Sequence, residues 1–266
     1  MKINGAKLHV EDTGGAGPAI VFSHGLLFSA TMWRFQVEAF RGRHRCIAYD
    51  HRGQGKSEVT PSGYDMDTLA EDAAGLIGQL GAAPAHFVGF SMGGFVGMRV
   101  AARRPELLRS LVLMDTASDA EPWRNVPKYA AMSFLTRFFG AGPFVPTVLK
   151  LMFARRFRED PVRAGLREGI VREILCNDVT GMRRAVNGVI ARRAVSAEEM
   201  AGIGAPTLVI SGAEDCTIVP DRSMRTAARI RGARFLGVPR SGHTPAIEEP
   251  EAVNRALREF WDSLPN

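Results

Sequence analysis

Short apolar runs recur along the chain, and helix-like or glycine-rich segments separate them. The run at residues 19–22, Ala-Ile-Val-Phe, has no polar position at all. Strands without polar alternation are expected where both faces of a sheet are covered, as in parallel sheets. We therefore predict a short strand at residues 7–11, followed by buried strands at 19–22, 45–49, 85–89, 110–114, 206–211 and 233–238.

Between these runs, apolar residues recur every three to four positions, which is the spacing of an amphipathic helix. We predict helices at residues 31–40, 67–80, 95–103, 221–230 and 249–261. Asp67 stands at the start of the second of these and is a candidate N-cap. Strands that alternate with helices predict an α/β fold, with a mostly parallel sheet flanked by helices on both faces.

The alternation stops between residues 118 and 199. Prolines and arginines are frequent there, and the remaining apolar residues have helical spacing. We interpret this stretch as a helical cap inserted into a core domain made of residues 1–117 and 200–266. Its arginines are expected mainly on a solvated helix face.

Composition excludes several classes of protein. The chain has 266 residues, 45% of them hydrophobic, and a net charge of +6. It contains no unbroken Lys/Arg block, so nucleic-acid binding is not expected. The three cysteines form no Cys-x-x-Cys pair, which disfavours a disulfide framework or zinc site. No run approaches the ~20 apolar residues that span a bilayer, and residues 1–5 lack the apolar core expected of a signal peptide. We expect a cytoplasmic protein without a membrane span, either monomeric or dimeric.

The segment at residues 87–94 carries the first candidate chemistry. It reads Gly-x-Ser-x-Gly, with Gly89 and Gly93 on either side of Ser91. A serine at the tip of a tight strand-to-helix turn is strained, and only small neighbours leave room for it. Its hydroxyl would lie beside the positive end of a helix. The pattern makes Ser91 a candidate nucleophile, although glycine-rich turns without any catalytic role are also common.

A serine nucleophile needs a base, and histidine has a suitable pKa of about 6.5. His243 follows the last predicted strand, at the sheet edge where ligands bind in open parallel sheets. The base in turn needs a carboxylate to orient it. Asp215 follows another strand and is our first choice, with Glu214 and Asp115 as rivals.

Ser91, Asp215 and His243 occur in this order along the chain, each just after a predicted strand, with a helical insertion between the serine and the aspartate. This arrangement resembles the α/β-hydrolase family. Further matches are His24-Gly25 after an early strand, the loop at residues 50–57, which resembles Asp-x-Arg-Gly-x-Gly-x-Ser, and the histidine loop at residues 242–250. The resemblance covers nearly the whole chain except the insertion.

The resemblance implies an oxyanion hole made by the backbone N–H groups of Leu26 and Met92. It implies that His24, like the 50–57 loop, is structural. Phe28, Trp33 and Phe90 are candidates for lining the substrate pocket or packing beneath it. No metal and no cofactor are implied.

The implied reaction is hydrolysis of a small to medium, largely apolar ester or lactone by a carboxylesterase or enol-lactonase. Cofactor-free haloperoxidases, acting as perhydrolases, use the same triad, but they usually carry a proline where Leu27 stands. Carbon–carbon bond hydrolases are a further alternative. Some members of the fold act instead as small-ligand receptors, and the cap could serve such a role.

Overall fold

The computed structural model describes residues 1–265, and a seven-stranded sheet forms its centre. The strands lie in the order β3-β5-β4-β6-β7-β8-β9, and all neighbours pair in parallel except β3 with β5. The prediction of a mostly parallel sheet is confirmed. The strand bounds are β3 (Val10–Asp12), β4 (Ala19–Ser23), β5 (Arg45–Tyr49), β6 (Ala85–Phe90), β7 (Leu108–Met114), β8 (Thr207–Gly212) and β9 (Arg234–Val238).

The start of the chain differs from the prediction of one strand at residues 7–11. Strands β1 (Lys2–Ile3) and β2 (Ala6–Lys7) form a separate hairpin, and β3 begins only at Val10. Asn4 and Gly5 both have positive φ at the hairpin turn, which is the usual preference of a tight two-residue turn. Between β2 and β3, the backbone N–H of His9 donates to the Ser57 hydroxyl, so this part of the chain pairs with a loop and not with a strand.

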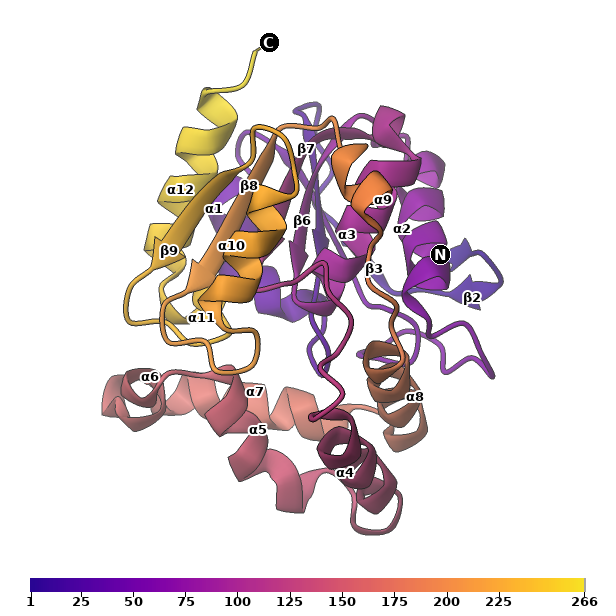
Figure 1. Ribbon diagram of the computed structural model, residues 1–266, viewed down its shortest axis with the longest axis vertical. Helices are drawn as coiled ribbons and strands as arrows, with labels where there is room; N and C mark the ends of the chain where they lie inside the picture. The colour runs from indigo at the N-terminus through magenta and orange to yellow at the C-terminus, as the bar shows by residue number, and fades with distance from the viewer. Residues whose placement is uncertain (266) are drawn as a thin grey trace.

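Helices cover both faces of the sheet (Figure 1). One apolar core lies under α2 (Met66–Gln79), α3 (Met92–Arg103) and α10 (Pro220–Ala228), with the short α9 (Ala197–Ala201) beside α3. A second core, on the opposite face, lies under α1 (Arg34–Phe40) and α12 (Pro250–Asp262), with the short α11 (Pro245–Glu248) against them. The 3-10 turns Ala30–Trp33 and Pro105–Leu107 join these elements.

The N-cap predicted for α2 is wrong. Asp65, not Asp67, caps the helix, and its carboxylate accepts the backbone N–H of Thr68 at 2.8 Å. Asp67 lies in the first turn, where its carboxylate accepts hydrogen bonds from Arg99 and Arg103 of α3. These two partners are distant in the sequence, so the local pattern could not show which aspartate was free to cap.

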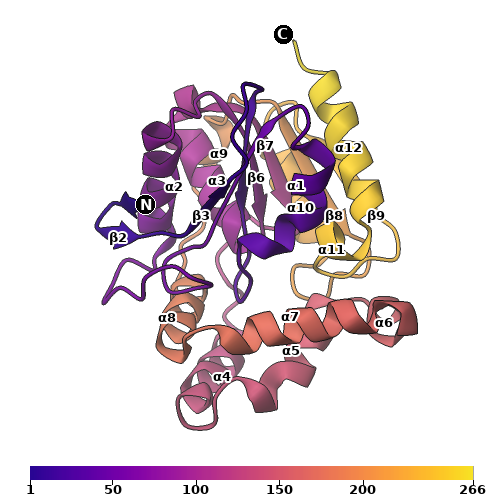
Figure 2. The ribbon, with the colours of Figure 1, turned by 180° about the vertical axis from the view of Figure 1, so that it is seen from behind.

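The helices α4 to α8 lie beyond the carboxyl ends of the strands, apart from both layers (Figures 1 and 2). They come from the segment that interrupts the strand–helix alternation. Within residues 1–265, no helix has both the length and the apolar character needed to cross a bilayer. The five cap helices are α4 (Val126–Phe139), α5 (Val145–Met152), α6 (Arg155–Glu159), α7 (Ala164–Cys176) and α8 (Val179–Ile190), with 3-10 turns at Gly142–Phe144 and Pro161–Arg163.

Candidate active site

Ser91 lies at the sharp turn between β6 and α3. Its backbone has φ 48° and ψ −108°, a conformation that non-glycine residues rarely adopt. A Cβ atom at Gly89 would lie 2.4 Å from the carbonyl oxygen of Gly93, and one at Gly93 would lie 2.1 Å from that of Ser23. The two glycines therefore make the turn possible. The N–H of Ser91 donates to the Met114 carbonyl at 2.8 Å, which ties the turn to β7.

His243 connects Ser91 to Asp215. Its Nε2 lies 3.1 Å from Ser91 Oγ, and its Nδ1 lies 2.7 Å from Asp215 Oδ2. The other carboxylate oxygen of Asp215 accepts the backbone N–H groups of Thr217 and Ile218, which hold the carboxylate in place. Both side chains are buried. Such a chain of hydroxyl, imidazole and carboxylate can take a proton from the serine as the hydroxyl attacks a substrate.

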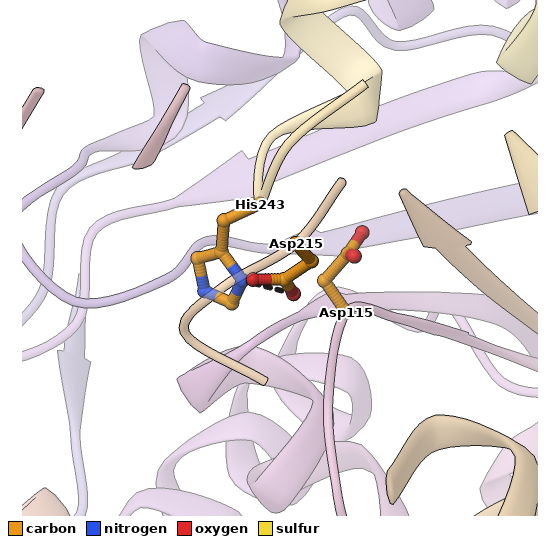
Figure 3. A group of neighbouring side chains, drawn as sticks. All are labelled: Asp115, Asp215 and His243. Carbon is orange, nitrogen blue, oxygen red and sulfur yellow. Dashed lines mark hydrogen bonds and ion pairs between the residues drawn. The ribbon is translucent and has the colours of Figure 1, made fainter. Parts of the chain in front are cut away.

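Within residues 1–265, neither rival carboxylate forms a hydrogen bond with His243. Glu214 is exposed. Asp115 is fully buried, and its Oδ1 accepts the backbone N–H of Gly212 at 2.8 Å. Figure 3 shows Asp215 facing the imidazole and the Asp115 carboxylate turned away from it. Burial, together with the neighbouring Asp215 carboxylate, raises the pKa of Asp115 well above its usual range.

These same side chains resemble a set of metal ligands. Ligand atoms of Asp115, Asp215 and His243 lie within 4.8 Å of one another. However, His243 Nδ1 and Asp215 Oδ2 are in direct hydrogen-bond contact, and Asp115 Oδ1 already accepts from the backbone. The arrangement therefore fits a proton relay better than metal ligation, because a metal ion bound by all three side chains would have to displace the hydrogen bond between His243 and Asp215.

The loop after β4 brings Leu26 beside the serine. The backbone N–H groups of Leu26 and Met92 donate to no acceptor among residues 1–265, and both residues line the cavity that contains Ser91. Leu27, the next residue, has φ 72°, and its N–H donates to Gln54 Oε1 at 2.8 Å. Gln54 also lies 3.8 Å from the Met92 sulfur. One side chain thus braces both segments that would contribute to an oxyanion hole.

The other polar residues of the loop after β4 and of the loop at residues 50–57 form hydrogen bonds and ion pairs within the protein. His24 Nε2 accepts the backbone N–H of His51, and its Nδ1 donates to the carbonyl of the next residue. Burial lowers the pKa of His24, in keeping with a neutral ring. Asp50 accepts the backbone N–H groups of residues 30 and 56. Arg52 forms a buried ion pair with Asp72 of α2 at 2.6 Å.

The family model for the alpha/beta hydrolase fold matches residues 18–250. The chain belongs to the α/β hydrolase family.

Individual members of the family are similar over nearly the whole length of the chain. A Mycobacterium tuberculosis protein, provisionally named non-heme bromoperoxidase BpoC, is 31% identical over 95% of this chain and 97% of that protein. An esterase of Thermogutta terrifontis, solved with malate bound, has a TM-score of 0.88 at 30% identity and covers 97% of this chain and 93% of its own. The enol-lactonase of Burkholderia xenovorans has a TM-score of 0.91 at 29% identity and covers 99% of each chain.

The cavity of this α/β hydrolase lies between Ser91 and the cap helices. Its volume is about 140 Å³, and most of its lining residues lie between residues 118 and 199, including apolar side chains of α4, α5 and α8. Phe90 contributes to the lining. Phe28 packs edge-on against Phe90, and Trp33 is fully buried against Phe22, so both belong to the core beneath the cavity.

Glu248 joins the histidine loop of the hydrolase to the cap. Its Oε1 accepts the backbone N–H groups of Gly242 and Thr244, which flank His243. Its Oε2 accepts the N–H of Ala154, just before α6, at 2.8 Å. The carboxyl group is completely buried, and that burial raises its pKa. The position of His243 is thus linked to the position of the segment before α6.

Three side chains at this site were not among the site residues predicted from the sequence. Gln54 and Glu248 lie inside the loops at residues 50–57 and 242–250, which resemble loops of the family, so the sequence contained a signal for both. Arg192 also lines the cavity, but the sequence contained no signal for it, because the arginines of the insertion were expected on a solvated face. That expectation suits Arg155 and Arg156, which are exposed, but it is wrong for Arg192, which is 6% exposed.

Proposed function

We propose that the protein is a serine hydrolase that cleaves a carboxylic ester or lactone through an acyl-enzyme. Ser91 is the nucleophile, His243 the general base, and Asp215 the carboxylate that orients the imidazole. The observation that carries this proposal is the unbroken relay of 3.1 Å and 2.7 Å from the Ser91 hydroxyl to Asp215. Similarity to an esterase and to an enol-lactonase supports it.

In the proposed mechanism, His243 takes the proton of Ser91 as its oxygen attacks the carbonyl carbon. The carbonyl oxygen becomes negative and accepts hydrogen bonds from the N–H groups of Leu26 and Met92. The tetrahedral intermediate then collapses, His243 protonates the leaving alkoxide, and the acyl group remains on Ser91. Water attacks in the second half of the cycle, activated by the same imidazole.

Residues 118–199 act in this proposal as the cap domain, and residues 1–117 and 200–266 as the catalytic core. The cap supplies most of the lining of the cavity, which is predominantly apolar. This lining supports a small to medium, largely apolar acyl or ring group as the bulk of the substrate.

The decisive variant is Ser91→Ala, measured on p-nitrophenyl esters of graded chain length and on a few lactones. We expect kcat to fall by up to ~10⁶, as in another serine hydrolase whose nucleophile was removed. A fluorophosphonate probe should label Ser91 in the native protein and fail in His243→Ala. If Ser91→Ala keeps more than a small fraction of the activity, the assignment is wrong.

A second candidate function is perhydrolysis, which the 31% identity to BpoC favours. The acyl-enzyme would be the same, with hydrogen peroxide instead of water attacking it to release a peracid. Halide oxidation that depends on both peroxide and a carboxylic acid would support this reaction. Multiple turnovers on either substrate class would count against a ligand receptor.

A further inference from the structure

Helix α4 forms part of the wall of the cavity, but its other side is exposed and apolar. Met132, Ser133 and Thr136, on the inner side, line the cavity. On the opposite side, Phe134 is 55% exposed and Phe138 62%, and the two rings pack edge to face with their centroids 5.3 Å apart. This exposed side, which we call the α4 patch, consists of Phe134, Leu135, Phe138 and Phe139.

Such a patch is unusual on a folded protein. A helix that is apolar on both sides is normally buried, and contiguous exposed apolar side chains with a polar rim mark a surface that binds something else. Helix α4 packs against α8 and lies at the outer edge of the inserted segment (Figures 1 and 2). Its 14 residues are too few to cross a bilayer, which takes about 20. The patch can therefore lie on a surface but cannot span a membrane.

The charges around the patch favour an anionic surface. Between residues 122 and 158 the chain contains seven Lys/Arg residues and no Asp or Glu. Lys128 and Arg137 of α4 are exposed, and within residues 1–265 neither forms an ion pair. At about 100° per helical residue, these two side chains stand on opposite sides of the row formed by Phe134 and Phe138. Positive charge thus borders the patch on both edges.

This combination fits a lipid bilayer better than a second copy of the chain. A symmetric contact between two α4 patches would bring Lys128 and Arg137 of both copies together, and like charges repel. In the interface of a bilayer, by contrast, aromatic and leucine side chains enter the boundary between headgroups and acyl chains, while lysine and arginine extend to the headgroups. The single protruding helix side, with rings in the middle and basic residues at the edges, has this pattern.

We propose that the α4 patch docks the protein on an anionic lipid bilayer. The four apolar side chains of the patch enter the headgroup boundary, and Lys128 and Arg137 bind the phosphate groups. Because the inner side of α4 lines the cavity, docking places one wall of the cavity next to the bilayer. The proposal concerns where the protein binds, and it does not depend on the reaction at Ser91.

The first test is co-sedimentation of the full chain with two kinds of vesicle, phosphatidylcholine alone and phosphatidylcholine mixed with phosphatidylglycerol. We expect binding to the mixed, anionic vesicles, with an affinity that decreases as salt is added, and at least tenfold weaker binding to phosphatidylcholine alone. Absence of binding to the anionic vesicles, or equal binding to both kinds, would overturn the proposal.

Two double variants separate the contributions of charge and of apolar contact. K128Q/R137Q should weaken binding to the anionic vesicles about 30-fold, since each basic side chain near such a surface contributes a factor of about 5. F134S/F138S removes the two central rings and should weaken binding about 10- to 100-fold. All four side chains are exposed, so both variants should fold, which thermal denaturation checks.

Matched controls lie elsewhere in the inserted segment. R155Q/R156Q removes two exposed arginines of α6, and V162S removes an apolar side chain that is 90% exposed. Each should bind the anionic vesicles within about fivefold of the native protein. If R155Q/R156Q loses as much affinity as K128Q/R137Q, net charge and not the α4 patch holds the protein on the vesicle, and the proposal is wrong.

A fluorescent reporter tests which side of the protein meets the lipid. Phe138→Trp in a Trp123→Phe background leaves one exposed tryptophan, inside the patch, because Trp33 and Trp261 are buried. Anionic vesicles should shift its emission to the blue, and brominated phosphatidylcholine in those vesicles should quench it. Binding without quenching would refute docking through α4.

Sedimentation velocity without lipid tests the second copy as the occupant of the patch. If the native protein is a dimer that F134S/F138S converts into a monomer, and neither binds vesicles, the patch is an interface between copies and the proposal is refuted.

Discussion

At the scale of single residues, Asp215 and Asp115 show how similar sequence positions acquire different roles. Each follows a parallel strand, at the edge of the sheet where Ser91 lies. Of the two, only Asp215 forms a hydrogen bond with His243, while Asp115 accepts the backbone N–H of Gly212 and has φ 44°. Sequence position could bring both carboxylates to the site. It could not show which of them faces the imidazole, because that depends on the course of two loops.

Exchanging each aspartate for asparagine separates the two roles. Asp215→Asn would hold His243 in the wrong tautomer, so we expect kcat to fall by ~10⁴, as for the same change in a serine protease. Asp115→Asn imitates the protonated carboxyl group that the raised pKa of Asp115 favours, and it keeps an acceptor for Gly212. Its kcat should stay within about tenfold of the native value in a p-nitrophenyl ester assay. The opposite order would make Asp115 the partner of the base.

At the scale of elements, the strands were predicted most accurately. Their apolar runs are continuous because helices cover both faces, so β5 was predicted with its observed bounds and β4 and β6 to within one residue. Two errors occurred, one at a local turn and one where partners distant in the sequence are involved. The hairpin before β3 follows from local Asn-Gly turn chemistry that was overlooked, whereas the cap of α2 depends on arginines of α3 that occupy Asp67.

The capping role of Asp65 can be measured directly. Asp65→Ala removes the acceptor of the Thr68 N–H and should lower the free energy of unfolding by about 1 kcal/mol. Asp65→Asn is the matched control, since asparagine is an equally good N-cap, and it should cost much less. Urea denaturation of the three proteins measures the difference. Equal losses for both variants would mean that the carboxylate charge, and not capping, stabilises this end of α2.

At the scale of the whole molecule, the site depends on contacts between segments far apart in the sequence. Glu248 joins the histidine loop to Ala154 at the start of α6, and Arg192 of the returning segment stacks on Phe95 of α3. The sequence predicted a helical insertion and a catalytic order. It could not predict these contacts, because helical spacing does not show how five helices dock on a sheet. The arrangement of Ser91, His243 and Asp215 was therefore more predictable than the lining of the cavity, most of which the docked insertion supplies.

The burial of several histidines makes the stability of the whole fold depend on pH. Burial lowers the pKa of His24, His51 and His86, that of His86 to about 3. A lowered histidine pKa means that the unfolded chain binds protons that the folded protein does not. Stability from these groups is therefore complete above the unfolded pKa of about 6.5 and decreases as the pH falls towards the folded values.

His86 offers the best test of this dependence, because it lies on β6 away from Ser91. Its Nδ1 is 2.7 Å from Ser110 Oγ, and its ring packs on Trp261. In the variant His86→Asn, the asparagine keeps a polar group near Ser110, but its side chain does not titrate. Between pH 6 and pH 4, the free energy of unfolding of the native protein should fall more steeply than that of the variant, by about 1 kcal/mol per pH unit. Chemical denaturation at several pH values measures both slopes, and parallel curves would show that His86 is not the neutral, buried group that the structure describes.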